Sequence, residues 1–335
     1  MGFRDKILKK KPLNNKVKMG GMREECESFV TWLYLFCFYV LPYIIALIVA
    51  VFGCSKANAA SDPAIEAGFI PHKALYDIRL TSKKSGTIIS NLSGKMMYEW
   101  HSACDGWVSD YQFDMLYEYV EIPAARVTSD ISTYESFDGK NFNFTVQRKK
   151  DGYPFEQFRG ATTDGEDGYP NNVAYSVPEN LVQALPKGTL FPMNHTLGVL
   201  KNIRQGKRFY NATLFDGSDG EGPVDVNTFI GKEYAYQLPK QAIDDSEDPK
   251  DENIDPALLN TKAWDIRLAF FPQNTSDFVA DYEMSVVFHE NGIISKMEIE
   301  YEDFSIIQNL IAIEPMELGC EDASSNGEDD EKVDE

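Results

Sequence analysis

The chain has 335 residues, enough for one large domain or two modest ones with a hydrophobic core. Hydrophobic residues make up 43% of it and aromatic residues 13%, a globular composition whose aromatic share favours β-structure. The formal net charge of −21 argues against binding nucleic-acid phosphates through charge, so we expect no nucleic-acid partner.

The N-terminal segment differs from the rest because it is basic and then apolar. The first 59 residues carry nine Lys/Arg against four Asp/Glu, and residues 29–53 form an uncharged run, FVTWLYLFCFYVLPYIIALIVAVFG. That run has about the ~20 residues needed to cross a bilayer. Ala57 and Ala59 then follow at the spacing that a signal peptidase reads. We predict that residues 1–59 are a signal peptide or an uncleaved membrane anchor, and that the bulk of the chain is periplasmic.

Export makes the cysteine count informative. Cys104 and Cys320 are the two cysteines beyond the predicted boundary; the others are Cys26, Cys37 and Cys54. An even pair in an oxidising compartment predicts a disulfide between Cys104 and Cys320. A nucleophilic thiol or a metal ligand is the alternative. His101, three residues before Cys104, faces the other side of a strand, and the chain lacks CxxC and HxxxH spacings.

Alternation with period two predicts most of the structured region to be strand. The first clear segment, YEWHSACDGWVSDYQFDMLYEY, predicts two strands joined by a short turn beside Cys104. Apolar and mainly polar residues alternate in its second half, from Tyr111 to Tyr119. Residues 142–146 alternate after Asp138-Gly139, a hairpin dipeptide. Residues 266–270 alternate in the same way. We expect a large antiparallel sheet.

One segment, FPMNHTLGVLKNIRQGKR, predicts an amphipathic helix that lies across this sheet. Leu197, Leu200 and Ile203 fall at helical spacing. Asn194 is the expected N-cap, and Gly206 is the expected end of the helix.

The loop FDGSDGEGPVD, residues 215–225, is the best candidate for a ligand loop. Its acidic residues, Asp216, Asp219, Glu221 and Asp225, offer oxygens suited to Ca²⁺. Counted from Asp216, however, the loop has Gly at position 5 and Glu at position 6, which does not match an EF-hand. Dense Asp and Gly are typical of turns, so we favour a structural loop and expect no cofactor or metal.

The clearest hairpin is YEMSVVFHENGIISKMEIEY, around Asn291-Gly292. A two-residue turn there predicts the facing pairs Val286–Met297, Met284–Ile299 and Tyr282–Tyr301. Glu283 then faces Glu300, which is tolerable only on a solvated face. Acidic stretches at residues 244–255 and 321–335 are expected to be loop-like or disordered.

Several short motifs follow one another in a fixed order along the chain. They are PHKALYDIRL, GKMMYEWHSACDGW, YESFDGKNFNF, LPKGTLFPMNHTLGVL, FDGSDG, AWDIRLAFF, YEMSVVFHENGIISKMEIEYEDFS and IEPMELGC. Each motif alone is weak, but the ordered set, from about residue 71 to 320, resembles the EipB family of periplasmic cell-envelope integrity proteins from α-proteobacteria. The sequence departs from that pattern in its long N-terminal segment, in Tyr134 at a usual Trp position, and in its acidic insert and tail.

The resemblance implies an open, barrel-like β-spiral, here a single domain over residues 60–320 that carries one helix and precedes an acidic tail, residues 321–335. It implies one disulfide, which maps onto the same pair, Cys104 and Cys320. It also implies envelope maintenance under stress, with a periplasmic tetratricopeptide-repeat protein as a functional partner. It supplies no catalytic residues.

Enzyme signatures are missing from the sequence. HExxH, GxSxG and SxxK do not occur. Of the four histidines, we expect His195 to hydrogen-bond at the helix start and His289 to be exposed beside its turn. We therefore favour a non-enzymatic module that binds a periplasmic protein, an envelope lipid or a wall component. The alternative is an envelope hydrolase or transferase without a recognisable motif.

Overall fold

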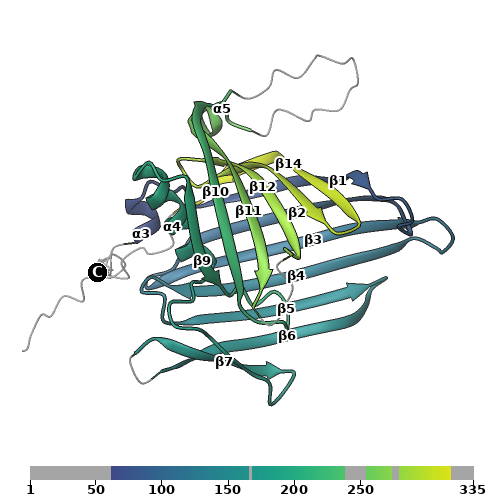
Figure 1. Ribbon diagram of the computed structural model, residues 1–335, viewed down its shortest axis with the longest axis horizontal. Helices are drawn as coiled ribbons and strands as arrows, with labels where there is room; N and C mark the ends of the chain where they lie inside the picture. Colours follow the sequence, from purple (N-terminus) through teal and green to yellow (C-terminus); the bar gives the residue numbers. More distant parts are fainter. Residues whose placement is uncertain (1–61, 166–167, 238–253, 274–278, 318–335) are drawn as a thin grey trace, which may run out of the picture. The chain divides into compact units, whose positions relative to one another are not determined.

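The computed structural model describes residues 62–165, 168–237, 254–273 and 279–317 (Figure 1). The predicted signal or anchor, most of the acidic insert and the acidic tail lie outside these residues. None of the helices that are described is long and apolar enough to cross a membrane.

Fourteen strands make up most of the described chain. They are β1 (His72–Lys83), β2 (Ile89–Ser102), β3 (Gly106–Tyr119), β4 (Ala125–Ser136), β5 (Phe142–Lys150), β6 (Tyr153–Asp164), β7 (Pro170–Val177), β8 (Val182–Ala184), β9 (Phe209–Leu214), β10 (Val224–Ala235), β11 (Lys262–Pro272), β12 (Tyr282–His289), β13 (Ile294–Tyr301) and β14 (Phe304–Pro315). The helices are α3 (Pro63–Glu66), α4 (Pro192–Arg204) and α5 (Pro256–Leu259).

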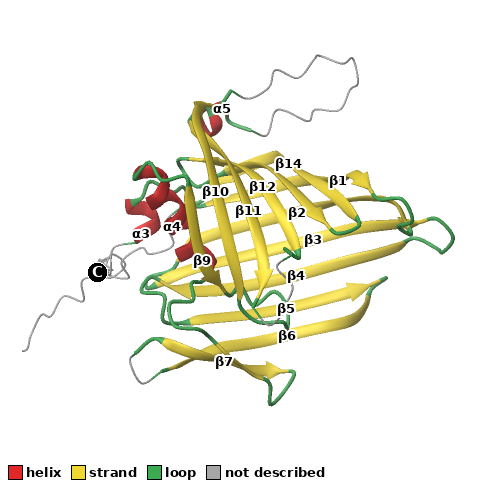
Figure 2. Cartoon of the chain, in the orientation of Figure 1, coloured by secondary structure: helices red, strands yellow, loops and turns green. Residues whose placement is uncertain are grey.

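All fourteen strands belong to one antiparallel sheet, which confirms the predicted fold class. Their order is β8-β7-β6-β5-β4-β3-β2-β1-β14-β13-β12-β11-β10-β9. The first and last strands therefore pair in the middle of the sheet, with Tyr76 opposite Leu310. The two free edges are β8 and β9, which are consecutive in the chain and joined by the segment that contains α4. Figure 2 shows α4 beside β9. The sheet is curled but not closed.

The predicted alternation accounts for the strands. In β5 the side chains of Phe142, Phe144 and Val146 are buried and the residues between them are exposed. Between β5 and the preceding β4, Gly139 has φ +67°, a conformation that favours glycine in the predicted Asp-Gly turn.

The predicted register of the last hairpin is confirmed. Val286 pairs with Met297, Met284 with Ile299, and Tyr282 with Tyr301. The register shifts beyond Val287, so the connection is longer than the expected two-residue turn.

The facing acidic residues of this hairpin share a cation. The Arg267 guanidinium, from the neighbouring β11, forms ion pairs with both Glu283 and Glu300. All three side chains are at least one-third exposed. Solvent and this arginine therefore relieve the repulsion between the two carboxylates.

Helix α4 ends as predicted but begins with a different cap. Its N-cap residue is Phe191, which makes no side-chain cap hydrogen bond, so the prediction of Asn194 as N-cap is wrong. Glu135 of β4 supplies the cap instead: its carboxylate accepts hydrogen bonds from the backbone N–H of Met193 (2.7 Å) and of Asn194 (2.8 Å). Gly206, with φ +71°, follows the C-cap as predicted and donates its N–H to Ile203 O at 2.9 Å.

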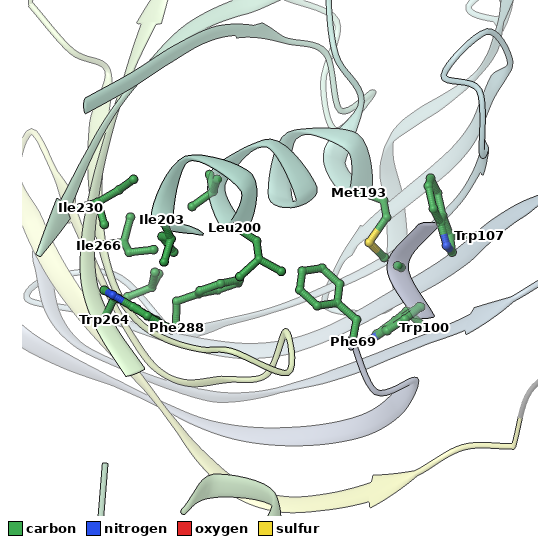
Figure 3. Close-up of a cluster of buried hydrophobic side chains, with 13 residues drawn as sticks. Phe69, Trp100, Trp107, Met193, Leu200, Ile203, Ile230, Trp264, Ile266 and Phe288 are labelled. Atoms are coloured by element: carbon green, nitrogen blue, oxygen red, sulfur yellow. The ribbon is translucent and has the colours of Figure 1, made fainter. Parts of the chain in front are cut away.

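The main hydrophobic cluster lies where α4 covers one end of the curled sheet. Figure 3 shows Leu200 and Ile203 of α4 pointing toward Trp264 and Phe288, with Phe69 between them and Trp100. The Trp107 indole N–H donates to Asp62 Oδ1 at 2.9 Å, and the same oxygen caps α3. The Trp107 N–H and Asp62 Oδ1 are therefore paired within this cluster, while the other Asp62 oxygen is buried without a partner.

A loop, rather than strand pairing, spans the two sheet edges. After β9, residues 215–222 run along the strands of the opposite edge. Arg148 Nη2 donates to Ser218 O at 2.7 Å, Tyr175 OH to Asp219 O at 3.4 Å, and Gln183 Nε2 to Gly220 O. A Cβ at Gly217 would lie 2.5 Å from the Phe144 ring, so glycine permits this close approach.

Candidate ligand-binding site

The inner face of the curled sheet encloses a cavity of about 830 Å³. This volume is within the roughly 300–1,000 Å³ range of small-molecule sites. Most of its lining is aromatic, aliphatic or methionine. The apolar lining includes Tyr76, Ile78, Met96, Tyr98, Tyr111, Phe113, Met115, Phe270, Tyr282, Met284, Met297, Ile299 and Ile306.

The cavity runs along the strands from the α4 end to the opposite end. At the first end it meets Met193 and His195 of α4. At the other end it reaches Phe304, which pairs with Lys83 where β1 finishes. Two lining residues on this side, Phe155 and Tyr301, are 58% and 39% exposed, so the cavity reaches solvent there.

Charged groups are scarce on the lining, where Arg148 and Asp216 alone carry them among the described residues. Arg148 is engaged, since its guanidinium forms an ion pair with Glu156 and donates to Ser218 O. Asp216 Oδ1 accepts the backbone N–H of Ser218 at 2.9 Å. The lining therefore combines a large apolar area with a few polar groups, as binding sites for largely apolar molecules do.

Three buried polar atoms on the lining have no hydrogen-bond partner: Ser129 Oγ, His195 Nε2 and Gln308 Oε1. The three residues are 7%, 6% and 3% exposed. Buried polar atoms in native proteins are nearly always paired with protein, water or ligand. The three atoms are themselves covered, so a bound molecule can pair with them only after the side chains rotate toward the cavity.

The cavity environment suppresses ionisation of its own side chains. Burial lowers the pKa of His195 to about 4 and also lowers the pKa of His72. Burial raises the pKa of Tyr98 to about 12 and that of Tyr111 well above its ordinary value. At neutral pH these four groups are uncharged. The expected hydrogen bond from His195 at the helix start is not formed, since Glu135 occupies that position.

Residues 215–225, the candidate calcium loop, use their carboxylates within the protein. Asp219 Oδ1 accepts the Glu221 N–H at 2.8 Å, and Asp225 Oδ1 accepts from Thr213 Oγ1 at 2.7 Å and Gln273 Nε2 at 2.8 Å. Phe215 packs with the aromatic residues of β5. Within the described residues no group of three or more His, Cys, Asp or Glu is placed to hold a metal. These contacts support a structural role for the loop, which spans the two sheet edges as described above.

A serine–histidine pair occurs away from the cavity. His289 Nε2 lies 2.9 Å from Ser295 Oγ, and His289 Nδ1 lies 3.0 Å from Thr261 Oγ1. His289 is fully buried, so the prediction that it is exposed is wrong; the Tyr236 ring and Thr261, which follows α5, cover it. Burial lowers its pKa to about 4, which makes it a weak base, and neither His289 nor Ser295 lines the cavity.

The predicted disulfide partners lie in different parts of the chain. Cys104 is in the short turn between β2 and β3, at the α4 end of the sheet. Cys320 falls outside the described residues. Their pairing stays a prediction.

The lining residues with the clearest chemistry were missed by the sequence analysis. Ser129 and Gln308 sit at inward positions of otherwise apolar rows, Ser129 between Val127 and Ile131, and Gln308 between Ile306 and Leu310. A polar residue at an inward position was the available signal. His195 and Asp216 were singled out, but for a helix start and a calcium loop rather than for a shared cavity.

Taken together, these features define a class: a curled, barrel-like antiparallel sheet that surrounds an apolar pocket. Comparison with known proteins identifies the family. A family model described as EipB-like matches residues 63–317, and the chain belongs to that family. The cell envelope integrity protein EipB of Brucella abortus is 28% identical over 272 residues, which cover 80% of this chain and 92% of that protein.

A solved structure supports the same fold. The crystal structure of a beta-barrel-like protein of a domain of unknown function from Brucella abortus is 27% identical, with a TM-score of 0.65. The match covers 74% of this chain and 99% of that one. The predicted family and the predicted barrel-like sheet are therefore both confirmed.

Proposed function

We propose that this chain supports cell-envelope integrity as a non-enzymatic, periplasmic binding protein whose cavity holds the apolar part of an envelope molecule. The cavity is the observation that carries the proposal. Its volume of about 830 Å³ and its apolar lining with unpaired polar atoms suit a bound amphiphile. The relative named for envelope integrity supplies the cellular context.

The partner is part of the same proposal. Among the partners expected from the sequence, the cavity favours an envelope lipid over a wall fragment, since a polar glycan would leave many hydroxyl groups unpaired against apolar walls. The tetratricopeptide-repeat protein implied by the family resemblance would act at another surface.

The experiment is to recover the full chain from its native host and to extract it with organic solvent for mass spectrometry. A near-stoichiometric apolar molecule is the expected result. Ser129→Phe places an aromatic ring in the cavity and should remove that molecule, together with rescue of envelope-stress sensitivity in a deletion strain. Ser132→Phe, at an exposed position of the same strand, is the matched control. Full rescue by a folded Ser129→Phe protein would contradict the proposal.

The enzymatic alternative predicts a different result. Replacing His101 or His289, neither of which lines the cavity, by alanine should leave rescue intact if the protein is not an enzyme. A folded His101→Ala or His289→Ala variant that abolishes rescue would instead support a hydrolase or transferase.

A further inference from the structure

We propose that the cavity selects an uncharged amphiphile of the acylglycerol class and discriminates against lipid anions such as fatty acids and phospholipids. The inference rests on the proposed function and specifies the ligand of the same cavity. It depends on the charges that face the cavity and on the polar atoms that lack partners there.

The first step concerns anions. Arg148 is the cation on the described lining, and its guanidinium already pairs with Glu156 and the Ser218 carbonyl. The side chains of Arg148 and Glu156 are 22% and 36% exposed, so an anionic head group would have to displace Glu156 from a partly buried pair. The lining histidines, His72 and His195, offer no positive charge at neutral pH because burial lowers their pKa values.

The second step concerns Asp216. Its carboxylate faces the cavity, and its partner is a backbone N–H rather than a cation. The effect of its charge reaches across the cavity. The pKa values of Tyr111 and Tyr282 are raised first by burial and additionally by the negative charge of Asp216. A carboxylate or phosphate brought into the cavity meets the same repulsion.

The third step concerns the uncharged head group. Three polar atoms of lining residues are covered and unpaired, and rotation of their side chains would bring them to a bound head group. Ser129 Oγ can then donate and accept, Gln308 Oε1 accepts, and His195 Nε2 does either according to its tautomer. A plain hydrocarbon would leave all three atoms unpaired, which weakens binding. Glycerol hydroxyl groups and an ester carbonyl provide both donors and acceptors without charge, while the acyl chain packs along the methionine and aromatic walls.

The test uses two ligands with one acyl chain. The full chain, freed of bound lipid, is loaded with the fluorescent probe N-phenyl-1-naphthylamine, which is displaced at pH 8 by 1-decanoyl-glycerol or by decanoate. We expect the glyceride to displace the probe at a concentration at least about tenfold lower than the anion, and lengthening its chain should improve affinity about fourfold per methylene.

A matched pair of variants tests the charge. Asp216→Asn keeps an oxygen for the Ser218 N–H and should tighten decanoate binding several-fold while glyceride binding stays within about twofold. Asp225→Asn, in the following strand β10 and off the lining, should change neither. Ser129→Ala should weaken the glyceride several-fold, and Ser132→Ala, at an exposed position of β4, should not.

The outcomes separate the two proposals. If the probe does not bind at all, the proposed function fails. If the probe binds but decanoate competes as well as the glyceride, or Asp216→Asn leaves the preference unchanged, the cavity is a general apolar site and this inference is overturned.

Discussion

The packed cluster at the α4 end and the cavity inside the sheet differ in how their polar groups are paired. At the α4 end, the Glu135 carboxylate accepts three hydrogen bonds from Met193 and Asn194, and Asp62 caps α3 while bonding the Trp107 indole. In the cavity, Ser129 Oγ, His195 Nε2 and Gln308 Oε1 have no partner. Satisfied polar groups and dense packing stabilise a fold, whereas open volume and unpaired groups are retained where a protein binds something. The contrast is not complete, since Asp62 Oδ2 at the α4 end is also buried without a partner and His195 belongs to α4 itself.

The largest expected effect on stability comes from truncating a buried aromatic side chain at the packed end. Trp107 is 1% exposed, and it contacts Phe137 with ring centroids 4.9 Å apart. Trp107→Ala should lower the free energy of unfolding by about 3–5 kcal/mol. Phe209→Ala, at a ring that is 71% exposed, should change it by less than about 0.5 kcal/mol. Chemical denaturation measures both, and similar losses for the two would contradict the assignment of the core.

A second prediction uses the buried acid at the α4 end. Burial raises the Glu135 pKa from 4.5 to about 7, against the opposing effect of its hydrogen bonds. The folded pKa exceeds the unfolded one, so the stabilisation is complete below about pH 4.5 and is lost as the pH rises to about 7. Glu135→Gln removes this loss, so the stability difference between variant and wild type should shift by about 3 kcal/mol over that window. Parallel stability curves would show that the carboxyl titrates normally.

A third prediction concerns the turn between β2 and β3. If Cys104 pairs with Cys320, Cys104→Ala should cost at least about 2 kcal/mol of unfolding free energy. The double variant Cys104→Ala/Cys320→Ala should lose little more, because both changes break one bond. Peptide mapping without reductant tests the bond directly, and free thiols at both positions under oxidising conditions would refute it.

The smallest predicted effect compares two serines of β4 with nearly equal burial. Ser136 is 6% exposed, and its Oγ accepts hydrogen bonds from Lys140 N and Asn141 N and donates to Asp138. Ser136→Ala should cost about 1–2 kcal/mol. Ser129, 7% exposed, has an unpaired Oγ, so Ser129→Ala should stay within about 0.5 kcal/mol in protein freed of lipid. Equal losses for the two would mean that Ser129 has a partner in solution.

Local patterns predicted the local structure. The alternation around Asn291-Gly292 predicted three facing pairs of the last hairpin, and Gly206 predicted the end of α4. These features depend on residues close in sequence. The N-cap of α4 could not be predicted in this way, because Glu135 lies more than fifty residues before the helix. Asn194 was the cap that the local pattern indicated.

The candidate site could not be predicted from the sequence, because it forms only when the sheet curls. Ser129, Gln308, His195 and Asp216 come from four distant segments, and each has an ordinary local explanation. These residues are related only because their side chains line the cavity inside the curled sheet. Which strands face each other across the interior decides whether they share a site. That information lies in the pairing of β1 with β14, which has no local signature.

The pairing of β1 with β14 also sets an order of events during folding. Strand β1 can pair with β2 as soon as that hairpin exists, but its other edge has no partner until β14 has been made. An open strand edge invites pairing with other chains, and contacts between residues as distant as Tyr76 and Leu310 form slowly. Until β14 has been synthesised, the partly formed sheet therefore has an unpaired edge at β1 that is prone to aggregation.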